Sequence, residues 1–203
     1  MSQPIDLSYL SLYLFIEDRR KPGQKYLDPD FEQYRSIFEA RMHANSDEFF
    51  GVGNNTHSDG GVGLIGRRAD YIVRNADERP MFWYRRRLPL EGDNRKRLRD
   101  GLRDLLTMAE GLAAEPRLEG AVTFRTDRLR AFVDRSGEVP NTDEALQRLL
   151  PDLEPVARTL YGGGVKISRV PFGGRLGAEV AGPAGLSVRQ MLENLGQGKG
   201  IGN

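Results

Sequence analysis

Stretches in which apolar and polar residues alternate predict β-strands at several places along the chain. In residues 7–16, the leucines at alternate positions share one face with Ile16, while aromatic residues occupy the other face. The other alternating stretches are residues 69–74, 80–88, 121–126, 129–134, 165–168 and 175–180. Residues 121–126 and 129–134 are spaced as a β-hairpin, as are 165–168 and 175–180, so we expect a largely antiparallel sheet.

Apolar residues at helical spacing, together with capping signals, predict helices between these strands. Asp28 is expected to cap the first helix, and Asp93 is expected to cap the most strongly predicted one, which Pro116 ends. Ser187 and Gln190 have the spacing of a capping box for the last helix, and a glycine ends it.

A further helical region follows Asn141, which is expected to cap it. Pro151 and Pro155 interrupt this region. A proline inside a helix removes one backbone hydrogen bond and clashes with the preceding turn. We therefore expect two helices here, separated near Leu150.

The order of these elements is strand–helix, followed by three units of strand, strand and helix. This order predicts an α+β fold, with a mostly antiparallel sheet and helices packed on one face. Alternating βαβ crossovers are not evident, which disfavours a doubly wound nucleotide-binding fold. We expect residues 1–196 to form a single domain, with a subdivision near residues 90–117 as the alternative. Residues 197–203 are expected to be a flexible glycine-rich tail.

Composition narrows the chemistry that is open to the protein. Of its 203 residues, 38% are hydrophobic, which suffices for a continuous core at this length. The 30 basic and 29 acidic residues are nearly balanced, so neither a disordered chain nor a uniformly basic nucleic-acid coat is expected. Cysteine is absent, which excludes disulfides and thiol catalysis. His43 and His57 are the only histidines, so no metal site is expected.

The sequence carries no signal for export or for membrane insertion. Its N-terminal residues lack a basic segment, and no run approaches the roughly 18 to 20 apolar residues of a membrane helix. With a mean hydropathy of −0.54, the protein is expected to be soluble and cytoplasmic, without a membrane partner. Arginine greatly outnumbers lysine, which indicates coding bias in a GC-rich bacterial genome. This bias weakens any functional argument from arginine alone.

A basic segment at residues 85–103 is the first candidate site. Its proposed anion- or nucleic-acid-binding residues are Arg85, Arg86, Arg87, Arg95, Lys96 and Arg99. Several of them fall in the first turns of a predicted helix, where an N-terminus and convergent arginines favour a phosphate or a carboxylate. The aromatic residues at 82–84 would add a stacking surface for a base. In the alternative interpretation, the strand buries its aromatic residues and the arginines pair with nearby carboxylates.

The glycine-rich residues 51–68 are the second candidate site. Glycines let a backbone approach a phosphate, His57 and Asp59 are a candidate acid and base, and Arg67 and Arg68 are candidate clamps. The segment matches neither the P-loop nor the dinucleotide-binding pattern of glycines. The alternative interpretation is an ordinary hairpin connection in which His57 is exposed and has no role.

Acidic residues between positions 127 and 144 are the third candidate, for metal or glycosidase chemistry. We assign them to turns and helix starts instead, because no sequence pattern shows that two of them converge. No GxSxG or SxxK motif is present, which disfavours a serine hydrolase.

We therefore expect a non-catalytic bacterial protein that binds a partner or a ligand, for example as a subunit of a larger assembly. Another protein or a second copy of the chain is the expected partner. The first alternative is binding of a nucleic acid or a phosphate ligand through residues 85–103. The second is a small-molecule enzyme that uses residues 51–68. No motif identifies a cofactor.

Overall fold

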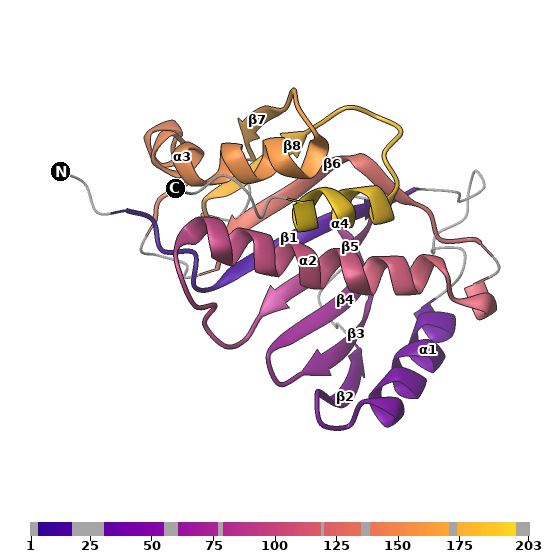
Figure 1. The fold of residues 1–203 in the computed structure, drawn as a ribbon. Helices are drawn as coiled ribbons and strands as arrows, with labels where there is room; N and C mark the ends of the chain where they lie inside the picture. Colours follow the sequence, from indigo (N-terminus) through magenta and orange to yellow (C-terminus); the bar gives the residue numbers. More distant parts are fainter. Residues whose placement is uncertain are drawn as a thin grey trace.

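The computed structural model describes residues 4–17, 31–54, 61–76, 79–118, 120–134, 139–170 and 174–197. Within these residues, eight strands form one antiparallel sheet in the order β2-β3-β4-β5-β1-β6-β8-β7 (Figure 1). The strands are β1 (Leu10–Ile16), β2 (Phe49–Asn54), β3 (Gly61–Gly66), β4 (Ala69–Ala76), β5 (Arg79–Arg86), β6 (Phe124–Val133), β7 (Lys166–Arg169) and β8 (Gly177–Ala181).

Helices cover one face of this sheet (Figure 1). They are α1 (Phe31–Ala44), α2 (Asn94–Ala113), α3 (Asp143–Tyr161) and α4 (Val188–Gln197), with a short 3-10 helix at Pro116–Leu118. Buried residues of all of these helices belong to the same hydrophobic cluster as one face of the sheet. The structure therefore confirms the α+β class, the antiparallel sheet and the helices on one face.

The central strand β1 contributes to both sides of the sheet. Leu12 and Leu14 are fully buried against the helices, as the alternating pattern predicts. Tyr13 and Phe15 point to the opposite side, which we call the open face. There they belong to a second hydrophobic cluster of buried residues, whose members are Tyr13, Phe15, Ile72, Met81, Trp83, Phe132 and Val170.

Arginine side chains lie over the aromatic rings of the open face. The guanidinium carbons of Arg74 and Arg85 are 5.5 and 5.4 Å from the ring centre of Trp83. That of Arg130 is 5.0 Å from the ring centre of Phe15. The open face is therefore an aromatic layer with cationic side chains above it, a favourable arrangement for arginine.

The predicted hairpin at residues 121–134 is wrong, because β6 is one continuous strand. Its pairing with β1 shifts register between Leu14 and Phe15, so an irregularity takes the place of a turn. Asp127 lies at this irregularity and pairs with Arg125 at 2.9 Å and with Arg128 at 3.3 Å. The polar residues 125–128, which resemble a turn in the sequence, thus form an ion-paired irregularity inside a strand.

The predicted break near Leu150 is also wrong, because α3 continues through Pro151 and Pro155. Proline has no N–H, so Pro155 leaves the carbonyl oxygen of Pro151 without its helical donor. The Nη2 atom of Arg95, on α2, donates to that oxygen at 3.0 Å. A neighbouring helix therefore replaces the lost hydrogen bond.

Two of the expected helix caps are present in the structure, whereas α4 (Val188–Gln197) continues through the glycine that was expected to end it. Asp93 caps α2, and the Ser187–Gln190 capping box is present with bonds of 2.8 and 3.1 Å. Thr142 caps α3 in place of the neighbouring Asn141. Asp28 lies outside the described residues. Four strands lie between α1 and α2 and one lies between α2 and α3, so the expected strand–strand–helix unit occurs only as β7-β8-α4.

Most of the glycine-rich candidate loop is a β-hairpin. Its described glycines lie on β2 and β3, which pair in antiparallel register, whereas His57 and Asp59 lie outside the described residues. A Cβ at Gly66 would overlap the backbone oxygen of Ala69, whereas a Cβ at Gly53 would meet nothing within 4 Å. Close backbone packing therefore accounts for Gly66.

This difference between two glycines of one hairpin is testable. Gly66→Ala is expected to lower the free energy of unfolding by about 2–3 kcal/mol, because a backbone atom cannot move aside as a side chain can. Gly53→Ala, the matched control, is expected to stay within about 0.5 kcal/mol of wild type. Urea unfolding of both variants measures this. Equal effects would show that the backbone approach at Gly66 is not the constraint.

Candidate functional site

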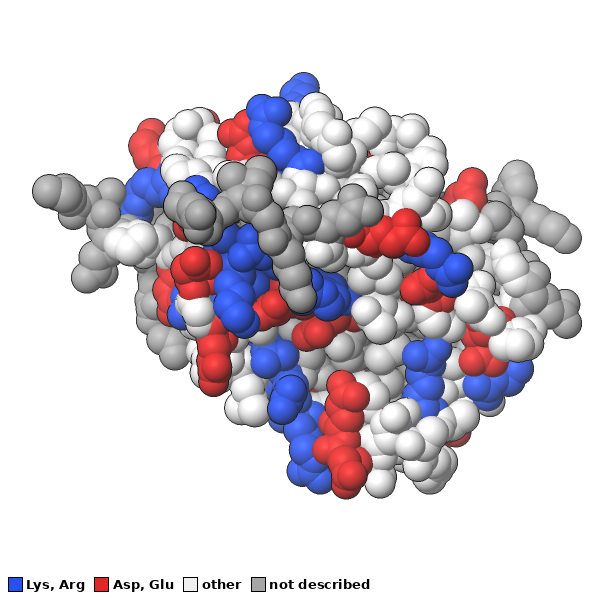
Figure 2. Space-filling view, viewed as in Figure 1, with Lys and Arg blue, Asp and Glu red and all other residues white. Residues whose placement is uncertain are grey.

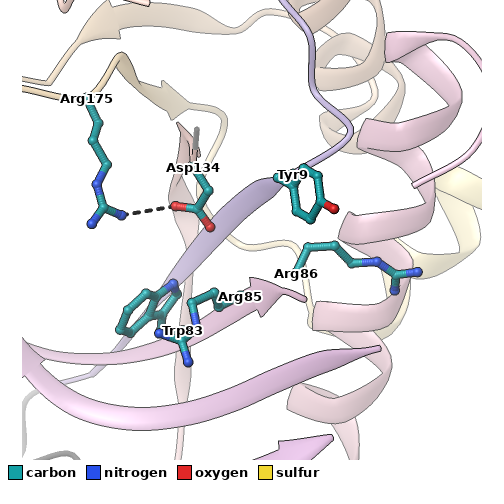
Figure 3. Close-up of a pocket in the computed structure, with 6 residues that line it drawn as sticks. All are labelled: Tyr9, Trp83, Arg85, Arg86, Asp134 and Arg175. Carbon is teal, nitrogen blue, oxygen red and sulfur yellow. Dashed lines mark hydrogen bonds and ion pairs between the residues drawn. The ribbon is translucent and has the colours of Figure 1, made fainter. Parts of the chain in front are cut away.

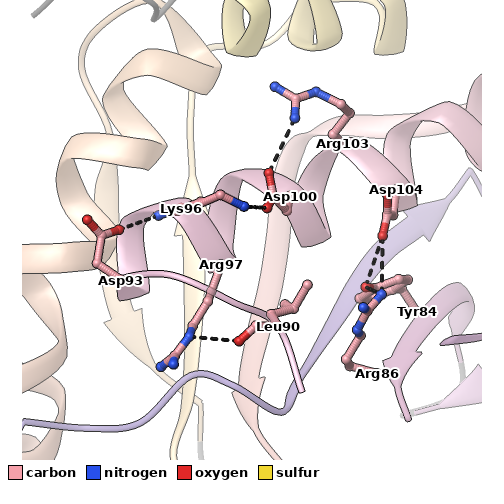
Figure 4. Close-up of polar contacts among 9 residues, drawn as sticks. All are labelled: Tyr84, Arg86, Leu90, Asp93, Lys96, Arg97, Asp100, Arg103 and Asp104. Atoms are coloured by element: carbon pink, nitrogen blue, oxygen red, sulfur yellow. Dashed lines mark hydrogen bonds and ion pairs between the residues drawn. The ribbon is translucent and has the colours of Figure 1, made fainter. Parts of the chain in front are cut away.

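The basic residues at the start of α2 are engaged with acidic groups of the protein (Figure 4). The backbone N–H of Lys96 donates to the Asp93 carboxylate at 2.7 Å, and its side chain pairs with Asp100 at 2.6 Å. Arg97 pairs with Asp6 at 2.7 Å. Across the helix-covered side of the molecule, basic and acidic side chains are interspersed (Figure 2). These contacts favour the structural interpretation of this part of the basic segment.

Arg95 and Arg99 complete the set on α2. Arg95 donates to the carbonyl of Pro151 and lies 3.7 Å from Asp152. Arg99 makes no hydrogen bond or ion pair with another described residue. Arg95 thus contributes to the packing of α2 against α3. The guanidinium of Arg99 has no polar partner among the described residues.

A double-mutant cycle tests the structural role of Arg95. Arg95→Ala is expected to lower the free energy of unfolding by about 1 kcal/mol. In a Pro155→Ala background, residue 155 regains an N–H that can bond to Pro151, so the same change is expected to have a smaller effect. We expect a coupling energy of about 0.5–1 kcal/mol by chemical denaturation. Additive effects would mean that Arg95 does not replace this bond, since its pair with Asp152 is the same in both backgrounds.

Asp70 joins the two basic regions that the sequence singles out. Its side chain is fully buried and accepts hydrogen bonds from Arg85 at 2.6 Å and from Arg87 at 3.4 Å. In the adjacent turn, Arg67 donates to the carbonyl of Asp47 at 2.9 Å, and the carbonyl of Arg68 accepts from the N–H of Arg87. The structure therefore places the turn at the end of the glycine-rich segment beside the end of β5.

A pocket of about 360 Å³ opens next to these arginines (Figure 3). Its lining residues are Tyr9, Trp83, Arg85, Arg86, Asp134 and Arg175. They come from β5, from the residues that flank β1 and β6, and from the segment before β8. The sheet order β5-β1-β6-β8 brings these segments side by side.

The indole of Trp83 has a buried N–H without an acceptor. Trp83 is 7% exposed, and its Nε1 has no hydrogen-bond partner among the described residues. Its ring stacks on Tyr13, with centroids 5.4 Å apart and planes 8° apart. Figure 3 shows the nitrogen on the side of the ring toward Asp134 and Arg175. The faces of the ring are therefore occupied by Tyr13 and arginines, while its N–H is buried at the wall of the pocket without an acceptor among the described residues.

Among the described residues that line the pocket, Asp134 is the single carboxylate. It accepts hydrogen bonds from the Ser11 hydroxyl and from Arg175, the latter at 3.1 Å. Burial raises the pKa of Asp134, against the opposing effects of the Ser11 hydrogen bond and of Arg175 and Arg85. The carboxylate thus holds Arg175 in place at the wall of the pocket.

A second pocket, of about 290 Å³, lies on the helix side of the sheet between α1 and α2. Asp104 lines it and accepts from the Tyr84 hydroxyl at 3.2 Å, and burial raises the pKa of both groups. Arg41 donates to the sulfur of Met108 at 3.1 Å, and burial lowers its pKa. This pocket presents both signs of charge, so it favours neither a simple anion nor a simple cation.

Comparisons with known proteins were made at three levels. No family model, curated protein or solved structure matches this chain. Function therefore has to be argued from the site itself. In the described part of the chain, no group of three or more acidic or histidine residues is arranged to hold a metal ion. No described helix has the length and apolar character needed to cross a bilayer.

Two lining residues, Tyr9 and Arg175, were not among the sequence candidates, and Asp134 was considered only with the acidic residues between positions 127 and 144, which were assigned to turns and helix starts. Arg85 and Arg86 were candidates, and Trp83 was expected only as a stacking surface. The available signal was the alternation on β5, which places Trp83, Arg85 and Arg87 on one face of the strand. Their partners come from distant segments, and only the order of strands in the sheet brings these together.

Proposed function

We propose that the protein is a non-catalytic binding protein for a small anionic ligand, which it holds in the Trp83 pocket. The observation that carries this proposal is the buried indole N–H of Trp83, which has no acceptor among the described residues. An unsatisfied buried donor costs about 1–3 kcal/mol, so a ligand oxygen at this position restores a lost hydrogen bond.

The charge of the lining identifies the class of ligand. Arg85 and Arg175 stand beside Trp83, and each guanidinium has five N–H donors. Arg175 uses Nη1 on Asp134, and Arg85 uses Nε and Nη2 on Asp70. The remaining donors suit a carboxylate or a phosphate, which arginine binds through paired charge-assisted hydrogen bonds. The volume of about 360 Å³ falls in the range of small-molecule sites.

Binding of a phosphate ligand, the first alternative from the sequence, partly coincides with this proposal, because Arg85 and Arg86 belong to both. The open face is less suited to binding a nucleic acid than a small anion. Tyr13 and Trp83 are only 6% and 7% exposed, which leaves little aromatic surface on which bases can stack. Titration with a dT20 oligonucleotide at several salt concentrations tests this alternative, since binding through phosphates weakens steeply with salt.

The fluorescence of Trp83 provides a direct test, because it is the only tryptophan in the chain. We expect a panel of succinate, glutarate, adipate and phenyl phosphate to contain anions that change its emission saturably at constant ionic strength. Glutaramide, an uncharged analogue of glutarate, is expected to cause no change. Arg175→Gln is expected to weaken binding at least about tenfold.

Arg189→Gln is the matched control, since Arg189 is a highly exposed residue of α4 on the helix side and pairs with Glu110. It is expected to bind like wild type. The proposal is wrong if no anion of the panel changes the emission, or if Arg175→Gln and Arg189→Gln bind alike.

A further inference from the structure

The second pocket, of about 290 Å³, has four charged residues among its described lining: Arg41, Glu48, Arg103 and Asp104. Two of these charges are already paired (Figure 4). A guanidinium nitrogen of Arg103 lies 3.4 Å from the Asp100 carboxylate. A guanidinium nitrogen of Arg86 lies 3.6 Å from the Asp104 carboxylate. The charges that remain for a ligand are therefore those of Arg41 and Glu48.

The Arg41 guanidinium has no oxygen acceptor among the described residues. Its one hydrogen bond to a described group goes from Nη1 to the sulfur of Met108, at 3.1 Å. A thioether is a weak acceptor, so most of the five N–H donors of the guanidinium are left without a partner. Burial lowers the pKa of Arg41, and the charge of Glu115 offsets this only in part. An anionic oxygen beside this guanidinium would supply the acceptor that the protein does not.

Gly111 of α2 provides the space in which this guanidinium lies. A Cβ at Gly111 would come within 2.8 Å of Nη2 and 3.1 Å of Nη1 of Arg41. Glycine in the interior of a helix is less stable than alanine. The missing side chain at this position lets the guanidinium pack against α2 beside Met108, at the wall of the pocket.

The Glu48 carboxylate is the second charge without a partner. Glu48 is an exposed residue between α1 and β2, and its side chain makes no hydrogen bond or ion pair with another described residue. Burial raises the pKa of Asp104, and the Asp100 and Glu48 carboxylates raise it further. A cation beside Glu48 is therefore favoured. Arg41 and Glu48 line the same cavity without pairing with each other, so one ligand can bind both.

The rest of the lining suits a ligand with an apolar part. Phe49 and Tyr71 are buried and pack edge to face, with ring centroids 6.1 Å apart. Met108 adds its thioether to the same wall. A simple anion would be repelled by Glu48 and a simple cation by Arg41. A ligand that carries one group of each sign avoids both repulsions.

We propose that the second pocket binds a small amino acid as its zwitterion, with the carboxylate on Arg41 and the ammonium group on Glu48. Arginine binds a carboxylate through paired charge-assisted hydrogen bonds, and an ammonium group has three donors for a carboxylate. The volume of about 290 Å³ is close to the lower end of the range of small-molecule sites. This inference is independent of the proposed function, which concerns the Trp83 pocket on the open face.

The test compares ligands that differ in one charge at a time. The zwitterions are β-alanine, 4-aminobutanoate and L-leucine, which differ in the spacing of the two charges and in the apolar chain. Each is compared with its amide, which keeps only the ammonium group, and with the acid that lacks the amino group. Binding is measured by calorimetry and by the rise in melting temperature at constant ionic strength. We expect the best zwitterion to bind at least about tenfold more tightly than either of its singly charged analogues.

Two variants assign the two charges to their partners. Arg41→Gln is expected to bring the affinities of the zwitterion and its amide within about threefold of each other, because the carboxylate loses its partner. Glu48→Gln is expected to do the same for the zwitterion and the acid without the amino group. Arg99→Gln is the matched control, since Arg99 is another helical arginine without a described partner but lines neither pocket. It is expected to bind like wild type.

A third variant separates binding from stability. Gly111→Ala keeps every charge but displaces the Arg41 guanidinium. It is expected to weaken binding of the zwitterion at least about threefold while the melting temperature of the free protein stays equal or rises, because alanine favours a helix.

The inference is wrong if none of the zwitterions binds more tightly than both of its singly charged analogues. It is also wrong if Arg41→Gln, folded by circular dichroism, binds the zwitterion as Arg99→Gln does. The proposed function stands or falls separately, because its anions are followed through Trp83 and its key variant is Arg175→Gln.

Discussion

Truncation after Gly185, which removes α4, is expected to leave a chain that no longer folds. α4 packs against α2 and α3, and its residues Met191 and Leu195 are 0% and 2% exposed. Together with Val188, these side chains contribute roughly 5–8 kcal/mol through burial. The total stability of a domain is about 5–15 kcal/mol. We expect circular dichroism and thermal unfolding to show no cooperative transition.

Truncation after Gly196 is the matched control, because it removes the glycine-rich C-terminal residues and keeps the apolar face of α4. It is expected to leave the melting temperature unchanged. If both truncated chains melt at the same temperature, α4 is not required for the fold and its packing contributes little.

Replacement of Asp70 by Ala is the second change with a large expected effect. It removes a fully buried carboxylate that accepts from Arg85, from Arg87 and from the backbone N–H of Gly66 at 3.3 Å. Loss of one partner of a buried ion pair costs about 3–5 kcal/mol. The two arginine side chains are 44% and 41% exposed, so water solvates them in part. We therefore expect a loss of about 3 kcal/mol in urea unfolding.

Asp100→Ala is the control for this change, because Asp100 also has two basic partners, Lys96 and Arg103, but lies at the surface with 30% of its side chain exposed. It is expected to cost no more than about 1 kcal/mol. Similar losses for the two variants would mean that burial of Asp70 does not strengthen its ion pairs. Because Asp70 also orients Arg85, Asp70→Ala is expected to weaken binding in the Trp83 pocket as well.

Local patterns in the sequence account for much of the fold. Alternation along residues 7–16 identifies a central strand, and the caps at Asp93 and Ser187 place two helices within a few residues of their true starts. These signals are reliable because each depends on neighbours in the chain. The predictions that were wrong depend on tertiary partners. β6 stays one strand because it pairs with β1 on both sides of its irregularity. α3 continues through Pro155 because Arg95 of α2 donates to the carbonyl oxygen that the proline leaves without a partner.

The candidate site was predictable only in part, for the same reason. The charge of residues 85–103 predicts an anion site, yet most of the basic residues of α2 contact acidic or backbone groups of the protein. Arg85 and Arg86 line the pocket because β5 lies next to β1. Asp134 and Arg175 reach the same place from segments that a single sequence does not connect with β5.

The position of β1 in the middle of the sheet also has a consequence for the order of folding events. Tyr13 pairs with Trp83 on one side and with Arg130 on the other, which follow it by 70 and 117 residues. During synthesis, β1 is the first strand to emerge and waits for both neighbours, whereas β2 to β5 pair in sequence as a meander. Contacts between distant residues close slowly because of the entropy of the intervening chain. The four strands of the meander therefore pair across short connections, whereas both pairings of β1 require long stretches of chain to close.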